Sequence, residues 1–266
     1  MKKRLIPVCL MLLTVRTVAI GDDNPGSLAD AKRLKRELPS TWENVSQADQ
    51  PKEMQFIKHV TPTHFTWVMY DRDKHAILAL TGGAWSLKDG KYEESIEFAS
   101  DSVQQLRGKT FQFTINLSGD KWDHKGVPDS EIKVDELWMR MKQGDHQKKN
   151  TGEPGRQLLG TWEAAARAGV PKAMRTVKHI TPTHWTWVAY DRDNKRVMAA
   201  AGGTWSLQNG EYVEECEFTT DNFPQARGNS YPYEYRLDRD QWTLKGGANR
   251  GIREDETWTR VKTPNP

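Results

Sequence analysis

An internal repeat is the feature that most limits what this chain can fold into. Residues 59–68 (HVTPTHFTWV) return as residues 179–188 (HITPTHWTWV), 120 positions later. Aligned without a gap, residues 40–142 and 160–262 are identical at about 46 of 103 positions. A unit of about 105 residues is long enough to be a domain rather than a short solenoid repeat. The sequence therefore predicts a tandem duplication of one domain.

The rest of the chain divides around the two copies. We expect domains at residues 38–142 and 158–262, joined by a polar linker at 143–157 that contains glycine and proline. Residues 22–37 precede the first copy and include a short helical pattern, which we expect to be a solvated linker helix.

Residues 1–21 have the pattern of a secretory signal peptide. A basic start, Lys2-Lys3-Arg4, precedes an apolar run that is too short to span a bilayer, and small residues place cleavage after Gly21. The alternatives are an uncleaved anchor or a disordered tail. Cleavage predicts a secreted or periplasmic protein with no membrane span in its mature chain. Four of the 39 basic residues lie in this leader, so the mature chain is nearly neutral and lacks the charge that nucleic-acid binding requires.

Turn signals and alternating apolar residues predict an all-β fold. Asp89-Gly90 and Asn209-Gly210 stand at equivalent positions in the two copies, and such dipeptides favour tight hairpin turns. About seven or eight short strands per copy, at spacings of about 8–12 residues, are typical of an antiparallel up-and-down barrel. The predicted fold is thus two tandem antiparallel up-and-down β-barrels joined by a short linker.

The first hairpin also predicts which side chains point inward. With Asp89-Gly90 as the turn, Trp85 pairs with Glu94 on the apolar face, since a slip of one residue would bury the charged face instead. The copies Trp205 and Glu214 repeat this arrangement. In the last strand, the same argument turns Glu136, Trp138 and Arg140 inward, with Glu256, Trp258 and Arg260 as their copies. The strand after Pro62 allows two orientations, one of which places His64 and its copy His184 in the cavity.

Several of these residues resemble the motifs of one known superfamily. Gly160-Thr161-Trp162 is similar to the Gly-x-Trp opening of lipocalins and other calycins, although the first copy has Ser40 before Trp42. The repeated TPTH segment, the Gly-Gly pair and the Tyr-x-x-Glu pattern look like bacterial secreted lipocalin-like domains of unknown function. The resemblance covers both copies and implies lipocalin-like barrels. It also implies that Arg140 and Arg260 close the barrels by lying across Trp42 and Trp162.

A candidate ligand site follows from the inward positions. Carboxylates on an apolar face are costly unless they are paired or functional, and aromatic side chains commonly line small-ligand cavities. The candidate ligand-binding residues are Glu94, Glu214, Glu136, Glu256, Tyr92, Tyr212, Trp85, Trp205, Trp138, Trp258, His64, His184 and Tyr233. The competing interpretation of the glutamates is a structural pair with an arginine or with the Trp85 indole.

The sequence predicts no catalytic residue set, metal site or cofactor. Two histidines separated by five residues around a proline are not a metal signature. Cys216 is the only cysteine after the leader, and its repeat partner is Ile96, so we expect it to be buried and apolar in role.

Three functions fit these observations. The preferred hypothesis is non-catalytic binding of a small hydrophobic or amphipathic molecule in one or both barrels. The first alternative is an isomerase- or hydrolase-type enzyme that uses Glu94 and Glu214 with His64 and His184 as acid–base residues. The second alternative is a structural envelope module with filled barrels.

Overall fold

The computed structural model describes residues 28–46, 51–129, 132–145, 147, 150, 152–165, 171–246 and 254–262. The predicted signal peptide and its cleavage site after Gly21 lie outside the described residues. Within these ranges the chain is mostly β-strand, which confirms the all-β prediction. None of the helices in the described residues has the length and apolar character that crossing a bilayer requires.

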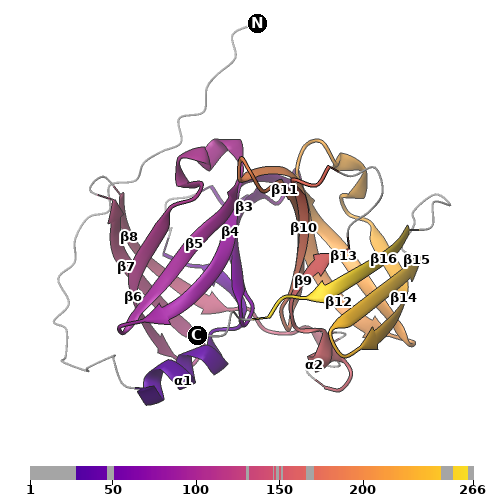
Figure 1. The fold of residues 1–266 in the computed structure, drawn as a ribbon, viewed down its shortest axis with the longest axis horizontal. Coiled ribbons are helices and arrows are strands. Elements are labelled where there is room, and N and C mark those ends of the chain that lie inside the picture. Colours follow the sequence, from indigo (N-terminus) through magenta and orange to yellow (C-terminus); the bar gives the residue numbers. More distant parts are fainter. Residues whose placement is uncertain are drawn as a thin grey trace, which may run out of the picture.

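In the first copy, eight antiparallel strands pair into a ring, called ring 1 below, and Figure 1 shows this copy beside the second. Each strand pairs with the next, and the eighth pairs back with the first. The strands are β1 (Ser40–Asn44), β2 (Met54–Val60), β3 (His64–Asp71), β4 (Ala76–Lys88), β5 (Lys91–Ala99), β6 (Thr110–Ser118), β7 (Lys121–Asp129) and β8 (Ile132–Arg140). A 3₁₀ helix, η1 (Asp101–Leu106), connects β5 to β6.

The second copy repeats this arrangement as ring 2. Its strands also pair in sequence, and the last pairs back with the first. They are β9 (Gly160–Ala164), β10 (Met174–Ile180), β11 (His184–Asp191), β12 (Arg196–Gln208), β13 (Glu211–Thr219), β14 (Ser230–Asp238), β15 (Gln241–Gly246) and β16 (Glu254–Arg260). A short 3₁₀ helix, η3 (Pro224–Ala226), corresponds to η1.

The predicted hairpin register is present in both rings. Lys88 pairs with Lys91, and Trp85 pairs with Glu94, around a turn in which Asp89 and Gly90 both have positive φ. A bulge interrupts β4 at Gly82, where a Cβ atom would lie 2.5 Å from the Phe65 carbonyl oxygen and 2.6 Å from the Phe98 ring. Only glycine fits so close an approach, which explains the Gly-Gly pair in each copy.

The two rings lie side by side and share a buried junction (Figure 1). Single parallel bridges join β5 to β12 and β4 to β13. Apolar side chains from the outer faces of the strands fill the space between the rings: Ile57, Val68, Tyr70, Leu80 and Phe98 from ring 1, and Val177, Val188, Tyr190, Ala200 and Phe218 from ring 2. Several strands are therefore buried on both faces, unlike the strands of an isolated barrel.

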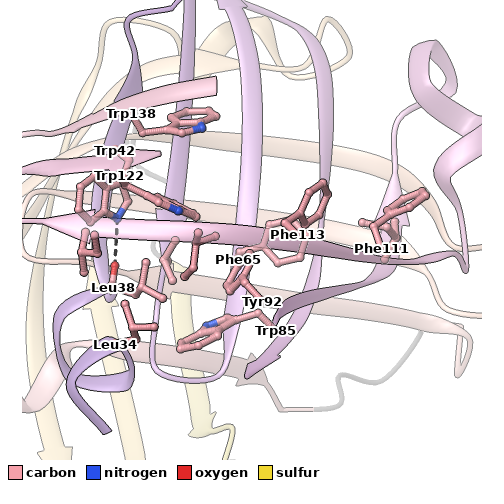
Figure 2. Packing of buried hydrophobic residues seen from close by; sticks show 14 of the residues in the cluster. Leu34, Leu38, Trp42, Phe65, Trp85, Tyr92, Phe111, Phe113, Trp122 and Trp138 are labelled. Carbon is pink, nitrogen blue, oxygen red and sulfur yellow. Dashed lines mark hydrogen bonds between the residues drawn. The ribbon is translucent and has the colours of Figure 1, made fainter. Parts of the chain in front are cut away.

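Helix α1 (Leu28–Glu37) packs against ring 1 and is not the solvated linker helix that the sequence suggested. Leu34 and Leu38 are buried in the ring 1 core together with Trp42. Arg33 of the helix donates a hydrogen bond to the Leu117 carbonyl oxygen at the end of β6. The apolar stripe of this short helix is thus used to cover one end of the ring (Figure 2).

The linker between the copies is likewise bound to the fold. Gln147 and Asn150 are buried, and their side-chain amides donate hydrogen bonds to backbone carbonyl oxygens of ring 2, including that of Trp205. The short helix α2 (Gly155–Leu158) then brings the fully buried Leu158 to ring 2, where it takes the place that Leu38 has in ring 1.

Candidate functional site

A buried ion pair lies inside each ring. Lys58 on β2 contacts Glu94 on β5, with 2.9 Å between Nζ and Oε1, and the two side chains are only 3% and 7% exposed. In ring 2, Lys178 contacts Glu214 at 2.8 Å, with 2% and 4% exposed. Glu94 and Glu214 are therefore inside, and their partner is a lysine rather than the arginine or indole considered from the sequence.

Aromatic rings surround each buried ammonium group. Lys58 Nζ lies 5.1 to 5.6 Å from the ring centroids of Phe65, Trp122 and Trp138. Lys178 has four such neighbours at 4.9 to 5.8 Å: Trp185, Tyr233, Trp242 and Trp258. The negative faces of these rings and the carboxylate partner together offset the cost of removing the ammonium group from water.

A second carboxylate stands on β8 or β16 inside each ring. Glu136 Oε2 accepts a hydrogen bond from Trp138 Nε1 at 3.0 Å, and Glu256 Oε2 accepts one from Trp258 Nε1 at 2.8 Å. Unlike the first carboxylates, these side chains keep contact with solvent, at 22% exposed for Glu136 and 11% for Glu256. Each interior thus contains one buried, ion-paired carboxylate and one carboxylate that solvent can reach.

The second partner of Glu136 in ring 1 differs from that of Glu256 in ring 2. In ring 1, His124 Nδ1 lies 3.2 Å from Glu136 Oε2. Burial, together with the charge of Lys58, lowers the pKa of His124, so the imidazole is neutral at pH 7. Burial would raise the pKa of Glu136, but the bonds from His124 and Trp138 and the charge of Lys58 outweigh it, and the pKa is lowered. An ionised Glu136 therefore accepts a hydrogen bond from the Nδ1–H group of a neutral His124.

In ring 2 a lysine fills that role. Lys178 Nζ reaches Glu256 at 3.4 Å in addition to Glu214, and Leu244 occupies the position of His124. Burial alone would lower the pKa of Lys178, but the two carboxylates raise it. Burial and the charge of Glu256 raise the pKa of Glu214 despite the lysine beside it. The tyrosine also differs, because Tyr212 Oη donates to Glu214 at 2.8 Å.

The arginines of the last strands lie across the tryptophans of the first strands. The guanidinium carbon of Arg140 is 4.2 Å from the Trp42 ring centroid, and that of Arg260 is 4.1 Å from Trp162. Arg140 also donates to the Glu37 carbonyl oxygen at 2.9 Å and pairs with Asp120. Because these contacts use the guanidinium groups at the covered end of each ring, they leave them little capacity to bind a ligand.

His64 and His184 lie outside both interiors, which corrects the expectation that they line a cavity. Phe65 and Trp67 point inward from β3, so His64 and Thr66 point outward into the junction. The His64 ring lies 5.9 Å from that of His179, and the His184 ring lies 5.6 Å from that of His59. These histidines cannot act together with Glu94 or Glu214, because the wall of the ring separates them.

The remaining candidate residues contribute mainly to packing. The indoles of Trp85 and Trp205 donate to the carbonyl oxygens of Thr61 and Thr181, each at 2.8 Å. Cys216 is buried, and burial raises the pKa of its thiol to about 12, so it is not a ready nucleophile.

Sequence reasoning missed Lys58, Lys178 and His124. The signal for the lysines was available: in residues 56–60, Phe56 and Val60 share one face of β2, and Lys58 stands between them on that same face. The contact of His124 with Glu136 needed the β7–β8 register, which pairs these two residues directly.

The described residues contain no group of three or more histidine, cysteine, aspartate or glutamate side chains that could hold a metal ion. Among the described residues, one surface hollow is lined by residues such as Glu43 and Arg72, and another by residues such as Asp101 and Arg196. Neither is lined by the interior glutamates.

No protein-family model matches this chain, and no curated protein matches it. Solved structures give only remote likeness. The β subunit of DNA polymerase III from Thermotoga maritima is 11% identical with a TM-score of 0.13, and the alignment covers 86% of this chain and 58% of that one. The Helicobacter pylori β clamp in complex with carprofen is 10% identical with a TM-score of 0.13, covering 89% and 58%. The chain thus spans under two thirds of the length of these structures, and the scores are too low to carry an argument about fold or function.

Proposed function

We propose that each ring is a lipocalin-like barrel and that the chain is a non-catalytic binding protein for a small amphipathic molecule. The observation that carries the proposal is the solvent-reached carboxylate inside each ring, Glu136 or Glu256. A tryptophan N–H already orients it, and aromatic side chains surround it. Such a combination of an apolar wall and few directed polar groups is how small-ligand sites are usually built. The signal-like residues 1–21 add a secreted or periplasmic location to the proposal.

The charge inside each ring indicates which head group fits. One lysine faces two glutamates, so each interior has an excess of hydrogen-bond acceptors. The head group must therefore donate a hydrogen bond, as an amine or hydroxyl does. The apolar body would pack on the inward faces of β6 and β14, where Phe111, Phe113, Tyr233 and Tyr235 lie.

Close packing favours one competing function. Trp42, Tyr92, Trp122 and Trp138 are fully buried in ring 1, which is also what a filled structural module would show. The enzyme alternative has less support, because His64 and His184 lie across the wall from the glutamates that they would assist.

Binding of N-phenyl-1-naphthylamine tests the proposal, because this probe is apolar, carries one N–H donor and fluoresces strongly only away from water. We expect the full chain to enhance its fluorescence. The double variant Glu136→Gln plus Glu256→Gln should weaken binding about tenfold or more, the size of one charged hydrogen bond. Glutamine still accepts the tryptophan N–H, so the fold should persist.

The matched control is Asp135→Asn, the neighbour of Glu136 on the outer face of β8, which should bind the probe like the unaltered chain. No enhancement by the unaltered chain, or equal binding by the double variant, would favour filled barrels instead.

A further inference from the structure

The two rings differ in whether their interior polar atoms find partners. In ring 1, three buried side-chain atoms make no hydrogen bond: Tyr92 Oη, Trp122 Nε1 and His124 Nε2. Their rings are mutual neighbours, with centroids 5.2 to 5.7 Å apart. Unpaired buried polar atoms cost free energy, and three in one cluster point to a ligand that would pair them.

Ring 2 satisfies most of the equivalent positions internally. Tyr212 bonds to Glu214, and Leu244 stands where ring 1 has His124, so that only Trp242 Nε1 is left among these positions. Ring 2 therefore has fewer buried polar atoms that a bound ligand could pair.

The unpaired atoms in ring 1 have a specific hydrogen-bonding character. Because His124 donates a hydrogen bond from Nδ1–H to Glu136, its Nε2 carries a lone pair and can only accept. The Tyr92 hydroxyl can donate or accept, and Trp122 Nε1 only donates. A hydroxyl group matches this set, since it donates to His124 Nε2 and accepts from Tyr92 or Trp122. An ammonium group does not match it, because it cannot accept and Lys58 lies close to the Trp122 ring.

We propose that ring 1 is the specialised binding site of the chain and takes a neutral hydroxyl on an apolar body, such as a phenol, through His124. The apolar body lies against Phe113, whose ring centroid is 4.1 Å from that of His124. Ring 2 serves mainly as the structural partner. This assignment rests on the proposed function and narrows it to one ring and one head-group class.

Isothermal titration calorimetry of the full chain with 1-naphthol and with 1-methoxynaphthalene tests the assignment. The methyl ether has nearly the same apolar body but no proton to donate. We expect one naphthol per chain and about tenfold weaker binding of the ether, a comparison that needs no variant.

His124→Leu places in ring 1 the residue that ring 2 already carries, so it should fold, and we expect it to weaken naphthol binding about tenfold. The matched variant Leu244→His should leave ring 1 binding unchanged. Tyr92→Phe removes the second partner of the hydroxyl and should also weaken naphthol more than the ether.

Two equal sites per chain, equal affinity for the ether, or unchanged binding by His124→Leu would each overturn the assignment. If N-phenyl-1-naphthylamine binds through Glu136 and Glu256 while naphthol ignores His124, only this inference fails. If neither probe binds, the proposed function fails as well.

Discussion

At the scale of single residues, we expect loss of the buried lysine of either ring to lower the free energy of unfolding strongly. Lys58→Met keeps a side chain of similar length but leaves the Glu94 carboxyl group without its partner in an interior where both groups are almost fully buried. Removing one member of a buried pair typically costs about 3–5 kcal/mol of unfolding free energy. We expect a loss of that size in urea denaturation of the variant. The control is Lys58→Met combined with Glu94→Leu, which removes both charges and should recover much of the stability; a single variant as stable as the unaltered chain would contradict a structural role for the pair.

At the scale of elements, helix α1 acts as a cover for ring 1. Leu34 is 7% exposed and packs on the ring core, whereas Lys35 beside it is exposed. Leu34→Ala should lower the unfolding free energy by about 2–4 kcal/mol, because it removes buried apolar volume. Lys35→Ala should change it by less than about 0.5 kcal/mol. Thermal unfolding of both variants distinguishes this role from a solvated helix, for which the two substitutions would have equally small effects.

The same scale shows what local sequence can predict. The Trp85–Glu94 register followed from a two-residue turn and the cost of burying charges, both of which act within a single hairpin. The pairing of Lys58 with Glu94 was harder to predict than its inward position, because Glu94 lies three strands further along the chain. The orientation of His64 could not be predicted from one copy, since its neighbour His179 belongs to the other ring.

At the scale of the whole molecule, the duplication is used to bury polar groups between its two copies. Thr41 bonds to Thr181 at 2.6 Å, and Thr61 bonds to Thr161 at 2.7 Å, so the same positions meet across the junction in opposite order. Internal identity alone cannot show that the copies share a face, because it says which residues recur and not which surfaces meet. The junction is consequently the part of the fold that sequence reasoning did not reach.

The histidines of this junction predict how stability depends on pH. Burial lowers the pKa of His59 and His179 well below the ordinary value and that of His184 to about 4. A group with a lowered pKa in the fold binds its proton more readily when unfolded, so acid favours unfolding. Stability should be fully present above the unfolded histidine pKa of about 6.5 and should fall as the pH drops toward 4. Each such histidine adds to a loss of stability that grows as the pH falls below about 6.5.

Carboxylates near the junction change the stability in another pH range than the histidines, or change it in the opposite direction. Glu97 has a pKa that its contact with His64 lowers against the effect of burial, so its contribution is lost only below about pH 4.5. Burial raises the pKa of Glu217, which makes acid slightly stabilising there. Between pH 6.5 and 5 the groups that lose stability are therefore the buried histidines, namely the three at the junction and His124 inside ring 1. Urea midpoints measured at pH 7.5 and 5.0 should differ strongly for the unaltered chain.

Two variants assign that difference to the junction. His59→Asn plus His179→Asn retains a polar atom near each threonine partner but removes two of the four histidines with lowered pKa values, so the loss of stability between pH 7.5 and 5.0 should shrink by about half. His75→Asn, at an exposed position on the edge of the junction, should leave that loss unchanged. Because only the paired copies bury these imidazoles, a double variant with the same pH dependence as the unaltered chain would mean that the rings do not pack through this face in solution.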